Sequence, residues 1–245
     1  MKQLLFQVID ESIQVELERK GLLDSYVIEE EGAILVGGRS EKKLESENAI
    51  LISENLAVDW SSQWESFAEN YFDGKAHIDL KPFGGEKELL LYPGAGFGDL
   101  SHPTTRLMLE MMQKKVSKRD VIDIGSGSGI LTLSALLLGA NSSLGIEIDQ
   151  DSLTHARKNA KLNHLSIKFL KKLSKKLPPN PLFLMNMTFH EQKGFDPSKL
   201  KGTWIVSGIL ESQKKEYLKL AKNWGWTTVE KHKKDGWMGW TFSLG

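Results

Sequence analysis

The chain has 245 residues, of which 40% are hydrophobic and 26% are charged, and its formal net charge is zero. The length and composition suit one large globular domain with a small appendage. Because the net charge is zero, no strong overall electrostatic field attracts the protein to nucleic acid or membrane. The absence of cysteine excludes disulfides, thiolate metal sites and a cysteine nucleophile. The N-terminus carries acid inside any apolar stretch and no segment could span a bilayer, so we expect a cytoplasmic protein without a signal peptide.

Residues 1–56 predict a small α+β domain. The hydrophobic periodicities indicate a strand over 4–9, an amphipathic helix over 12–22, a strand–turn–strand unit over 26–36 that ends at Gly37-Gly38, and a charged helix or loop over 41–47.

Residues 57–90 predict a connector rich in aromatic side chains. Trp64, Phe67 and Tyr71 follow a helical spacing, which core packing explains most simply. A strand over 88–92 then leads into the glycine-rich loop 93–98. A helix to about residue 114 follows, with Ser101 or His102 as its cap and proline in its first turn.

The segment 121–163 carries the most informative motif. An apolar strand breaks at Gly125-Ser126-Gly127-Ser128-Gly129, a helix follows, and a second apolar strand ends at Glu147. Glycine allows a positive φ and lets a ligand approach a backbone that has no Cβ. An acid at the end of the second strand can accept both hydroxyls of an adenosine ribose. The pattern predicts a βαβ nucleotide-binding unit.

The glycine spacing distinguishes between cofactors. Dinucleotide folds carry G-x-G-x-x-G and a P-loop needs a lysine after its last glycine, and this chain has neither. Its D-x-G-x-G-x-G pattern, which begins at Asp123, resembles motif I of the class I methyltransferases that use S-adenosylmethionine. The motif therefore points to the cofactor class and leaves the substrate open.

Residues 164–245 continue the alternation of strands and helices. We expect strands over 166–170, 182–186 and 204–207, helices around Pro197 and over 213–223, and a final antiparallel hairpin over 226–243. The predicted fold class is α/β. It combines a seven-stranded, mostly parallel, Rossmann-like methyltransferase sheet that ends in an antiparallel hairpin with the small N-terminal α+β domain.

Four segments carry a more specific resemblance: VDWSSQWESF at 58–67, LYPGAGFGDLSHPTTRL at 91–107, VIDIGSGSGIL with GIEID at 121–131 and 145–149, and VSGILESQ at 206–213. They resemble the ribosomal protein L11 methyltransferase family, PrmA. The resemblance implies S-adenosylmethionine-dependent N-methylation of lysine side chains and the N-terminus of ribosomal protein L11. It also implies a substrate-recognition domain over 1–56, a connector over 57–90 and a catalytic domain over 91–245.

The resemblance and the glycine motif together name the candidate site. The implied cofactor contacts, with the loop residues over the methionine end of the cofactor and the motif residues, are Phe97, Gly98, Thr105, Asp123, Gly125, Gly127, Glu147 and Asn186. Asp123 is expected to hydrogen-bond loop amides or to meet the amino group of the cofactor. Asn186 ends a strand where ligands of open α/β sheets bind. It is the predicted catalytic residue, because its carbonyl can accept an amine hydrogen and orient the lone pair.

For other residues near the site we expect structural roles or contacts made by backbone groups. Asp149 is expected to cap a helix and His102 to be structural. The adenine contact should come from 170–174, where the lack of a carboxylate leaves backbone groups or Ser174. The loop also departs from the family at Asp99-Leu100, where relatives usually have threonine and glycine. No metal site is expected.

Two alternatives stay open. The chain is a class I methyltransferase of another protein or small amine, or a cofactor-binding module with decayed catalysis. Against base methylation, it lacks the N/D-P-P-Y/F tetrapeptide after the fourth strand. We expect ribosomal protein L11 as substrate, no membrane, no sequence-specific nucleic acid and a monomer. The basic run 168–176 is most simply a solvated face.

Overall fold

The computed structural model describes residues 2–30, 33–56 and 70–244. The chain divides into two compact units, Met1–Asp59 and Trp60–Gly245. The helix expected around Trp64 and Phe67 lies outside the described residues, whereas Tyr71, expected on the same face, lies in a strand instead. Within the described part, no helix is long and apolar enough to cross a membrane.

The described part of the first unit is an antiparallel sheet with one helix. The sheet has the order β2-β3-β1-β4, and its elements are β1 (Lys2–Val8), α1 (Ile13–Lys20), β2 (Leu23–Glu30), β3 (Ala33–Ser40) and β4 (Ala49–Leu56). Alternate residues of β1, including Leu4 and Phe6, pack against Leu17 of the helix in a small core. The α+β character is as predicted, although β4 was not foreseen.

The interpretation of Gly37-Gly38 as the end of the hairpin was wrong, because β3 continues through both residues to Ser40. A Cβ at Gly38 would lie 2.7 Å from Cγ of Leu22. The glycine therefore allows close packing inside the strand instead of ending it.

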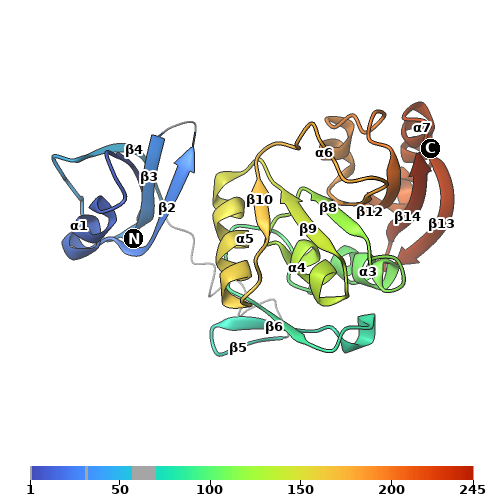
Figure 1. Ribbon diagram of the computed structural model, residues 1–245, viewed down its shortest axis with the longest axis horizontal. Coiled ribbons are helices and arrows are strands. Elements are labelled where there is room, and N and C mark those ends of the chain that lie inside the picture. Colours follow the sequence, from blue (N-terminus) through green and yellow to red (C-terminus); the bar gives the residue numbers. More distant parts are fainter. Residues whose placement is uncertain (1, 31–32, 57–69, 245) are drawn as a thin grey trace. The chain divides into compact units, whose positions relative to one another are not determined.

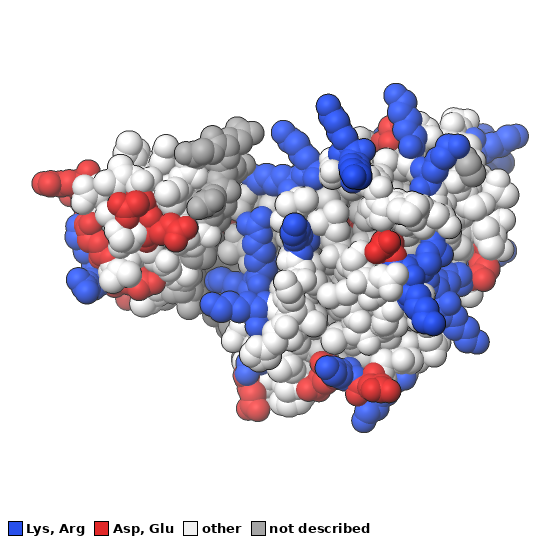
Figure 2. Space-filling view, in the orientation of Figure 1, with Lys and Arg blue, Asp and Glu red and all other residues white. Residues whose placement is uncertain are grey.

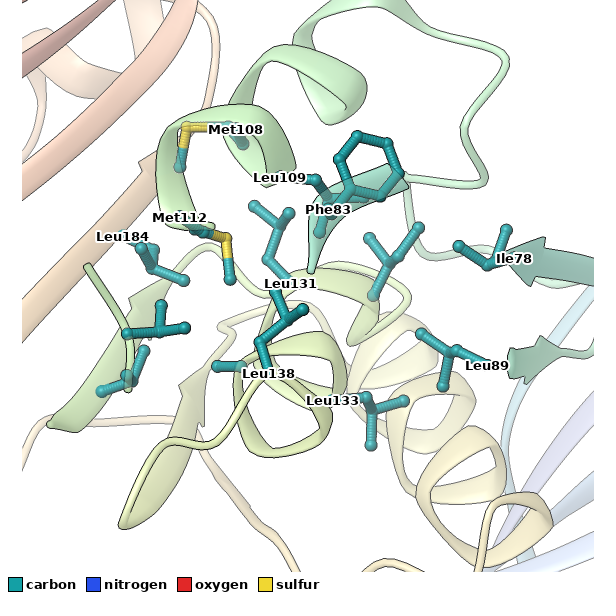
Figure 3. Close-up of a cluster of buried hydrophobic side chains, with 14 of the residues drawn as sticks. Ile78, Phe83, Leu89, Met108, Leu109, Met112, Leu131, Leu133, Leu138 and Leu184 are labelled. Atoms are coloured by element: carbon teal, nitrogen blue, oxygen red, sulfur yellow. The ribbon is translucent and has the colours of Figure 1, made fainter. Parts of the chain in front are cut away.

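The second unit begins with a small antiparallel sheet of order β5-β6-β7. Its elements are β5 (Tyr71–Phe72), β6 (Lys75–Asp79), the 3-10 helix η1 (Lys81–Phe83) and β7 (Glu88–Leu91). Ile78, Phe83 and Leu89 point from these elements into the same core as Met108 and Leu131 (Figure 3).

The main sheet has seven strands in the order β10-β9-β8-β11-β12-β14-β13 (Figure 1). The strands are β8 (Asp120–Ile124), β9 (Ser142–Ile146), β10 (Lys168–Leu170), β11 (Leu182–Asn186), β12 (Gly202–Leu210), β13 (Thr227–Lys234) and β14 (Trp237–Leu244). The first five strands run parallel, and β14 is antiparallel to both β12 and β13. The predicted fold class is thereby confirmed.

Helices cover both faces of this sheet. The helices are α3 (Pro103–Met112), α4 (Ile130–Leu137), α5 (Gln150–Leu162), α6 (Phe189–Lys193) and α7 (Lys214–Asn223), with the 3-10 helix η2 (Glu211–Gln213) before α7. Successive strand residues alternate between two cores: Leu182 and Leu184 pack with α3, α4 and α5, whereas Phe183 and Met185 pack with α6 and α7. Such burial on both faces explains the near-continuous apolar runs in the sequence.

The helix expected around Pro197 was wrong. The helix of this segment is α6, which begins after Thr188 and ends before Gly194, and Pro197 lies in the loop beyond it. Thr188 and Glu191 form a capping box, in which each side chain binds the backbone amide of the other residue. That pairing satisfies two amides that the first turn of a helix leaves open.

Candidate cofactor and substrate site

A pocket of about 860 Å³ lies at the carboxyl edge of the parallel strands, within the second unit. Its volume falls in the range of roughly 300–1,000 Å³ that is usual for small-molecule sites. Five of the predicted site residues line it: Phe97, Gly125, Gly127, Glu147 and Asn186. Gly98, Thr105 and Asp123 are buried and are not part of its lining. The structure therefore brings the predicted residues of four separate segments to one place.

The glycine loop after β8 is fixed by the end of β9. The amides of Gly125 and Ser126 both donate to the carbonyl oxygen of Ile146, at 2.8 and 3.0 Å. Gly127 has a φ of 53°, and a Cβ there would lie 2.6 Å from the carbonyl oxygen of Phe97. A larger residue would push the two loops apart, so glycine is required at this position.

Glu147 is held by backbone amides on both carboxylate oxygens. The amide of Gly127 donates to Oε2 at 2.9 Å, and that of Asp149 donates to Oε1 at 3.0 Å. These bonds hold the acid that follows β9 beside the glycine loop that follows β8. Asp149 itself accepts from the amide of Ser152 at 2.7 Å and caps α5, as predicted.

Asp123 lies behind the glycine loop and is 1% exposed. The expectation that it binds loop amides was wrong, because its Oδ2 accepts from the hydroxyl of Thr132 in α4, at 2.6 Å. Its Oδ1 is buried without a hydrogen-bond partner. Burial, and to a smaller extent the charge of Glu147, raise the pKa of Asp123 to about 7.

Two more predicted residues carry buried oxygens without partners. These atoms are Oδ1 of Asn186, at the end of β11, and Oγ1 of Thr105, in the first turn of α3. A buried acceptor or hydroxyl without a partner costs free energy. Of these residues and Asp123, only Asn186 lines the pocket, so its oxygen is the one that a polar ligand in the pocket can satisfy directly.

The position of Asn186 depends on a close approach between β11 and β12. Gly208 has a φ of 90°, and a Cβ there would overlap the carbonyl oxygen of Met187. The side-chain amide of Gln192 donates to the carbonyl oxygens of Met187 and Ser207, at 2.7 and 2.8 Å. These contacts fix the chain after Asn186, and they explain the glycine in the VSGIL segment.

An aromatic corner closes one side of the pocket. The ring of His102 meets Phe97 and Trp237 edge-on, at centroid distances of 5.3 and 4.9 Å. Its Nδ1 accepts from the amide of Thr104 at 3.3 Å, so His102 is the cap of α3. Burial lowers the pKa of His102. These contacts give His102 the structural role that the sequence suggested.

Several lining residues were not found from the sequence. Apolar ones among them are Ile148, Met187, Phe195 and Trp237. Ile148 is 82% exposed directly after Glu147. An apolar residue next to the acid that follows the strand was the sequence signal that could have marked it. In the segment 170–174, Lys171, Lys172 and Leu173 line the pocket, and Ser174 does not.

Comparison with known proteins identifies the family to which this chain belongs. A family model described as ribosomal protein L11 methyltransferase (PrmA) matches residues 14–244. The chain belongs to the ribosomal protein L11 methyltransferase family. The resemblance found in the four sequence segments is confirmed.

Individual members of the ribosomal protein L11 methyltransferase family agree with this result. The chain is 34% identical over 202 residues to the family protein of Prochlorococcus marinus, with 74% of this chain and 67% of that protein aligned. It is 30% identical over 210 residues to that of Dictyoglomus turgidum, with 80% and 69% aligned. A crystal structure of ribosomal protein L11 methylase from Lactobacillus delbrueckii matches with a TM-score of 0.54 and 29% identity, over 62% of this chain and 83% of that chain.

Proposed function

We propose that this protein is an S-adenosylmethionine-dependent methyltransferase that N-methylates amino groups of ribosomal protein L11, on lysine side chains and at the N-terminus. The observation that supports the cofactor is the hydrogen bond between Glu147, directly after β9, and the amide of Gly127 in the glycine loop after β8. The relatives named ribosomal protein L11 methyltransferase support the substrate.

The residues present fit S-adenosylmethionine. Glu147 would accept the ribose hydroxyls, as acids at this strand end do in related folds. We assign the ammonium of the methionine tail to Thr105 and Asp123, whose buried oxygens have no partner and lie behind the residues that line the pocket. Ile148 and Leu173 offer apolar surface to the adenine. No phosphate-binding lysine is needed, because the ligand has no phosphate.

The cofactor would supply a methyl group on a sulfonium. An amine nitrogen would attack this carbon in line, so that the N–C bond forms as the C–S bond breaks, S-adenosylhomocysteine leaves and the methylated ammonium releases a proton to solvent. The chain has to align a neutral amine, and alignment alone can supply much of the rate. Oδ1 of Asn186 would accept an amine hydrogen and point the lone pair at the methyl group. The apolar lining by Met187, Phe195 and Trp237 would lower the pKa of a lysine, usually about 10.4, because desolvation disfavours the ammonium.

The remaining assignments belong to the same proposal. Residues 1–56 recognise the substrate, 57–90 connect, and 91–245 catalyse; the second compact unit already begins at Trp60. The protein acts as a cytoplasmic monomer without sequence-specific nucleic-acid binding.

The test is transfer of label from methyl-labelled S-adenosylmethionine to purified ribosomal protein L11. We expect label on L11, and calorimetry on the same sample should show cofactor binding. Binding without transfer to L11 would contradict the substrate and leave two candidates: transfer to another amine, or a binding module without catalysis. The departure at Asp99-Leu100, where Leu100 has a φ of 84°, favours testing the second candidate explicitly.

A further inference from the structure

The helix α5 and its C-cap residue carry three polar side chains, each four residues from the next, that face β7 and the residues directly after it. They are His155, Asn159 and Asn163. Four helical residues rise about 6 Å, and two strand residues rise about 6.6 Å. One side chain of this α5 ladder can therefore meet every second residue of an extended chain.

The hydrogen bonds follow this spacing. Asn163 accepts from the amide of Leu90 at 2.8 Å and donates to its carbonyl oxygen at 2.6 Å. Asn159 accepts from the amide of Tyr92 at 2.8 Å. The strand β7 pairs with β6 on its other side, so the α5 ladder completes the edge that the small sheet leaves open.

His155 extends the ladder beyond the strand into the loop over the pocket. The amide of Gly96 donates to its Nδ1 at 3.1 Å, so this nitrogen is the acceptor. Nε2 then carries the proton and donates to the carbonyl oxygen of Tyr92 at 2.6 Å. The ring also packs on Gly94, where a Cβ would lie 2.5 Å from it. One ring therefore ties both ends of the segment 92–96.

This segment continues into the loop that touches the glycine motif. The amide of Ser128 donates to the carbonyl oxygen of Phe97 at 2.9 Å, and its hydroxyl donates to that of Gly98 at 2.6 Å. Asn159 of the ladder donates to the carbonyl oxygen of Ser128 at 2.8 Å. Ala95 and Phe97 line the pocket. The α5 ladder thus contacts both the loop 93–98 and the glycine motif, the two segments that meet at this side of the pocket.

We propose that His155 is a positioning residue for the cofactor, which sets the loop 93–98 over the glycine motif through its two backbone hydrogen bonds. This inference rests on the proposed function, since it takes S-adenosylmethionine as the ligand. His155 hydrogen-bonds the backbone of Tyr92 and Gly96 and acts on the pocket through Ala95 and Phe97, which line it. Burial lowers the pKa of His155 to about 4, so the ring is in the neutral form that these two bonds require.

The test compares two substitutions of the same residue. His155→Leu removes both hydrogen bonds, and His155→Gln keeps one acceptor and one donor on a planar group. We expect His155→Leu to speed hydrogen exchange at the Gly96 amide at least about fivefold in the ligand-free protein, because one hydrogen bond contributes about 1 kcal/mol. It should weaken S-adenosylhomocysteine binding roughly tenfold, and His155→Gln should restore both values toward wild type.

The matched control is Thr154→Val, one residue away. The hydroxyl of Thr154 donates to the carbonyl oxygen of Gln150 within α5 and not to the loop, so exchange and affinity should stay at wild-type values. If His155→Leu does not fold, Gly94→Ala supplies a second variant. It presses on the ring without removing a hydrogen-bonding group, and it should weaken cofactor binding in the same way.

The outcomes separate this inference from the proposed function. Wild-type affinity in His155→Leu, or equal weakening in His155→Gln and His155→Leu, would overturn the positioning role. Exchange at Gly96 and binding of S-adenosylhomocysteine are both measured without L11. A wild-type protein that binds cofactor but does not methylate L11 therefore refutes the substrate alone.

Discussion

Both carboxylate oxygens of Glu147 accept hydrogen bonds from backbone amides, those of Gly127 and Asp149. Each oxygen of an ionised carboxylate can accept a further hydrogen bond, so the acid is fixed in place while it keeps capacity for the two ribose hydroxyls. The same side chain therefore fixes the glycine loop and can also hydrogen-bond to the ligand.

Replacing Glu147 by alanine should weaken cofactor binding at least about tenfold, because hydrogen bonds to a charged group contribute about 1.5–3 kcal/mol. Calorimetric titration with S-adenosylhomocysteine measures the effect. Glu211→Ala serves as control, since Glu211 makes an exposed ion pair with Lys233 far along the chain. An unchanged affinity in Glu147→Ala would remove this residue from the site.

Ionisation of the buried Asp123 opposes folding. Its pKa is about 7 in the folded protein and 3.8 in the reference state. Between these two values the folded state keeps a proton that the unfolded state has released, so Asp123 makes stability fall as the pH rises from about 4 to 7. An ammonium on the cofactor would offset this cost.

Asp123→Asn should therefore gain stability relative to wild type as the pH rises through this window, by roughly 2–4 kcal/mol at pH 8. The same variant should bind S-adenosylhomocysteine more weakly, because the amide cannot pair with an ammonium. Urea unfolding at pH 5 and pH 8 gives the first quantity. A stability difference that is independent of pH would contradict the raised pKa.

Leu100 occupies a backbone conformation that suits glycine, with a φ of 84°. Its side chain packs against the main core, so its removal mixes two effects. The pair Leu100→Gly and Leu100→Ala separates them, because both variants lose the packing and only glycine relieves the backbone. Leu100→Gly should be the more stable by about 1 kcal/mol in urea unfolding; equal stabilities would show that the loop relaxes around alanine.

At the scale of elements, the close approach of β11 to β12 fixes the position of Asn186. Gly208→Ala should destabilise the protein by more than about 3 kcal/mol, since the backbone strain adds to a clash with the Met187 carbonyl. Gly225→Ala is the matched control. It has a similar φ of 79°, but its nearest atom would lie 3.4 Å away, so only the strain of about 1 kcal/mol applies. Similar losses in both variants would mean that the clash is relieved at no cost.

Most elements of the second unit could be predicted because the sequence repeats one pattern. Short apolar runs mark strands buried on both faces, and the observed β11 (Leu182–Asn186) has the predicted bounds. The error at Pro197 came from missing a local signal, the threonine and glutamate of the capping box at 188 and 191. Gly38 was misread because its function depends on contact with Leu22, which only the folded chain shows.

The candidate site divides in the same way. The glycine motif and Glu147 were visible because their chemistry depends on spacing along the chain. Trp237 and His155 were not, because Trp237 reaches the pocket from the last strand and His155 acts on a loop 59 residues away. Tertiary contacts of this kind leave no local pattern in a single sequence.

At the scale of the whole molecule, zero net charge conceals an asymmetry. Residues 1–59 contain 13 acidic and 6 basic residues, and residues 60–245 contain 19 acidic and 26 basic residues. Figure 2 shows Lys and Arg gathered over the visible face of the second unit. The acidic first unit suits a substrate that presents lysines, in line with its proposed role in recognition.

Salt should therefore weaken binding of the protein substrate more than binding of the cofactor. The KM for L11 should rise severalfold when ionic strength increases from about 0.05 to 0.5 M, because exposed charges are screened. Affinity for S-adenosylhomocysteine, which binds in a partly enclosed pocket, should change much less. A KM for L11 that does not depend on salt would contradict an electrostatic role for the first unit.

The most direct test of the proposed function is mass spectrometry of ribosomal protein L11 from cells with this enzyme, without it, and with only the Asn186→Ala variant. We expect methyl groups on lysine side chains and the N-terminal amine of L11 only where the wild-type enzyme is present. Identical L11 masses in all three samples would contradict the assignment of this protein as the L11 methyltransferase.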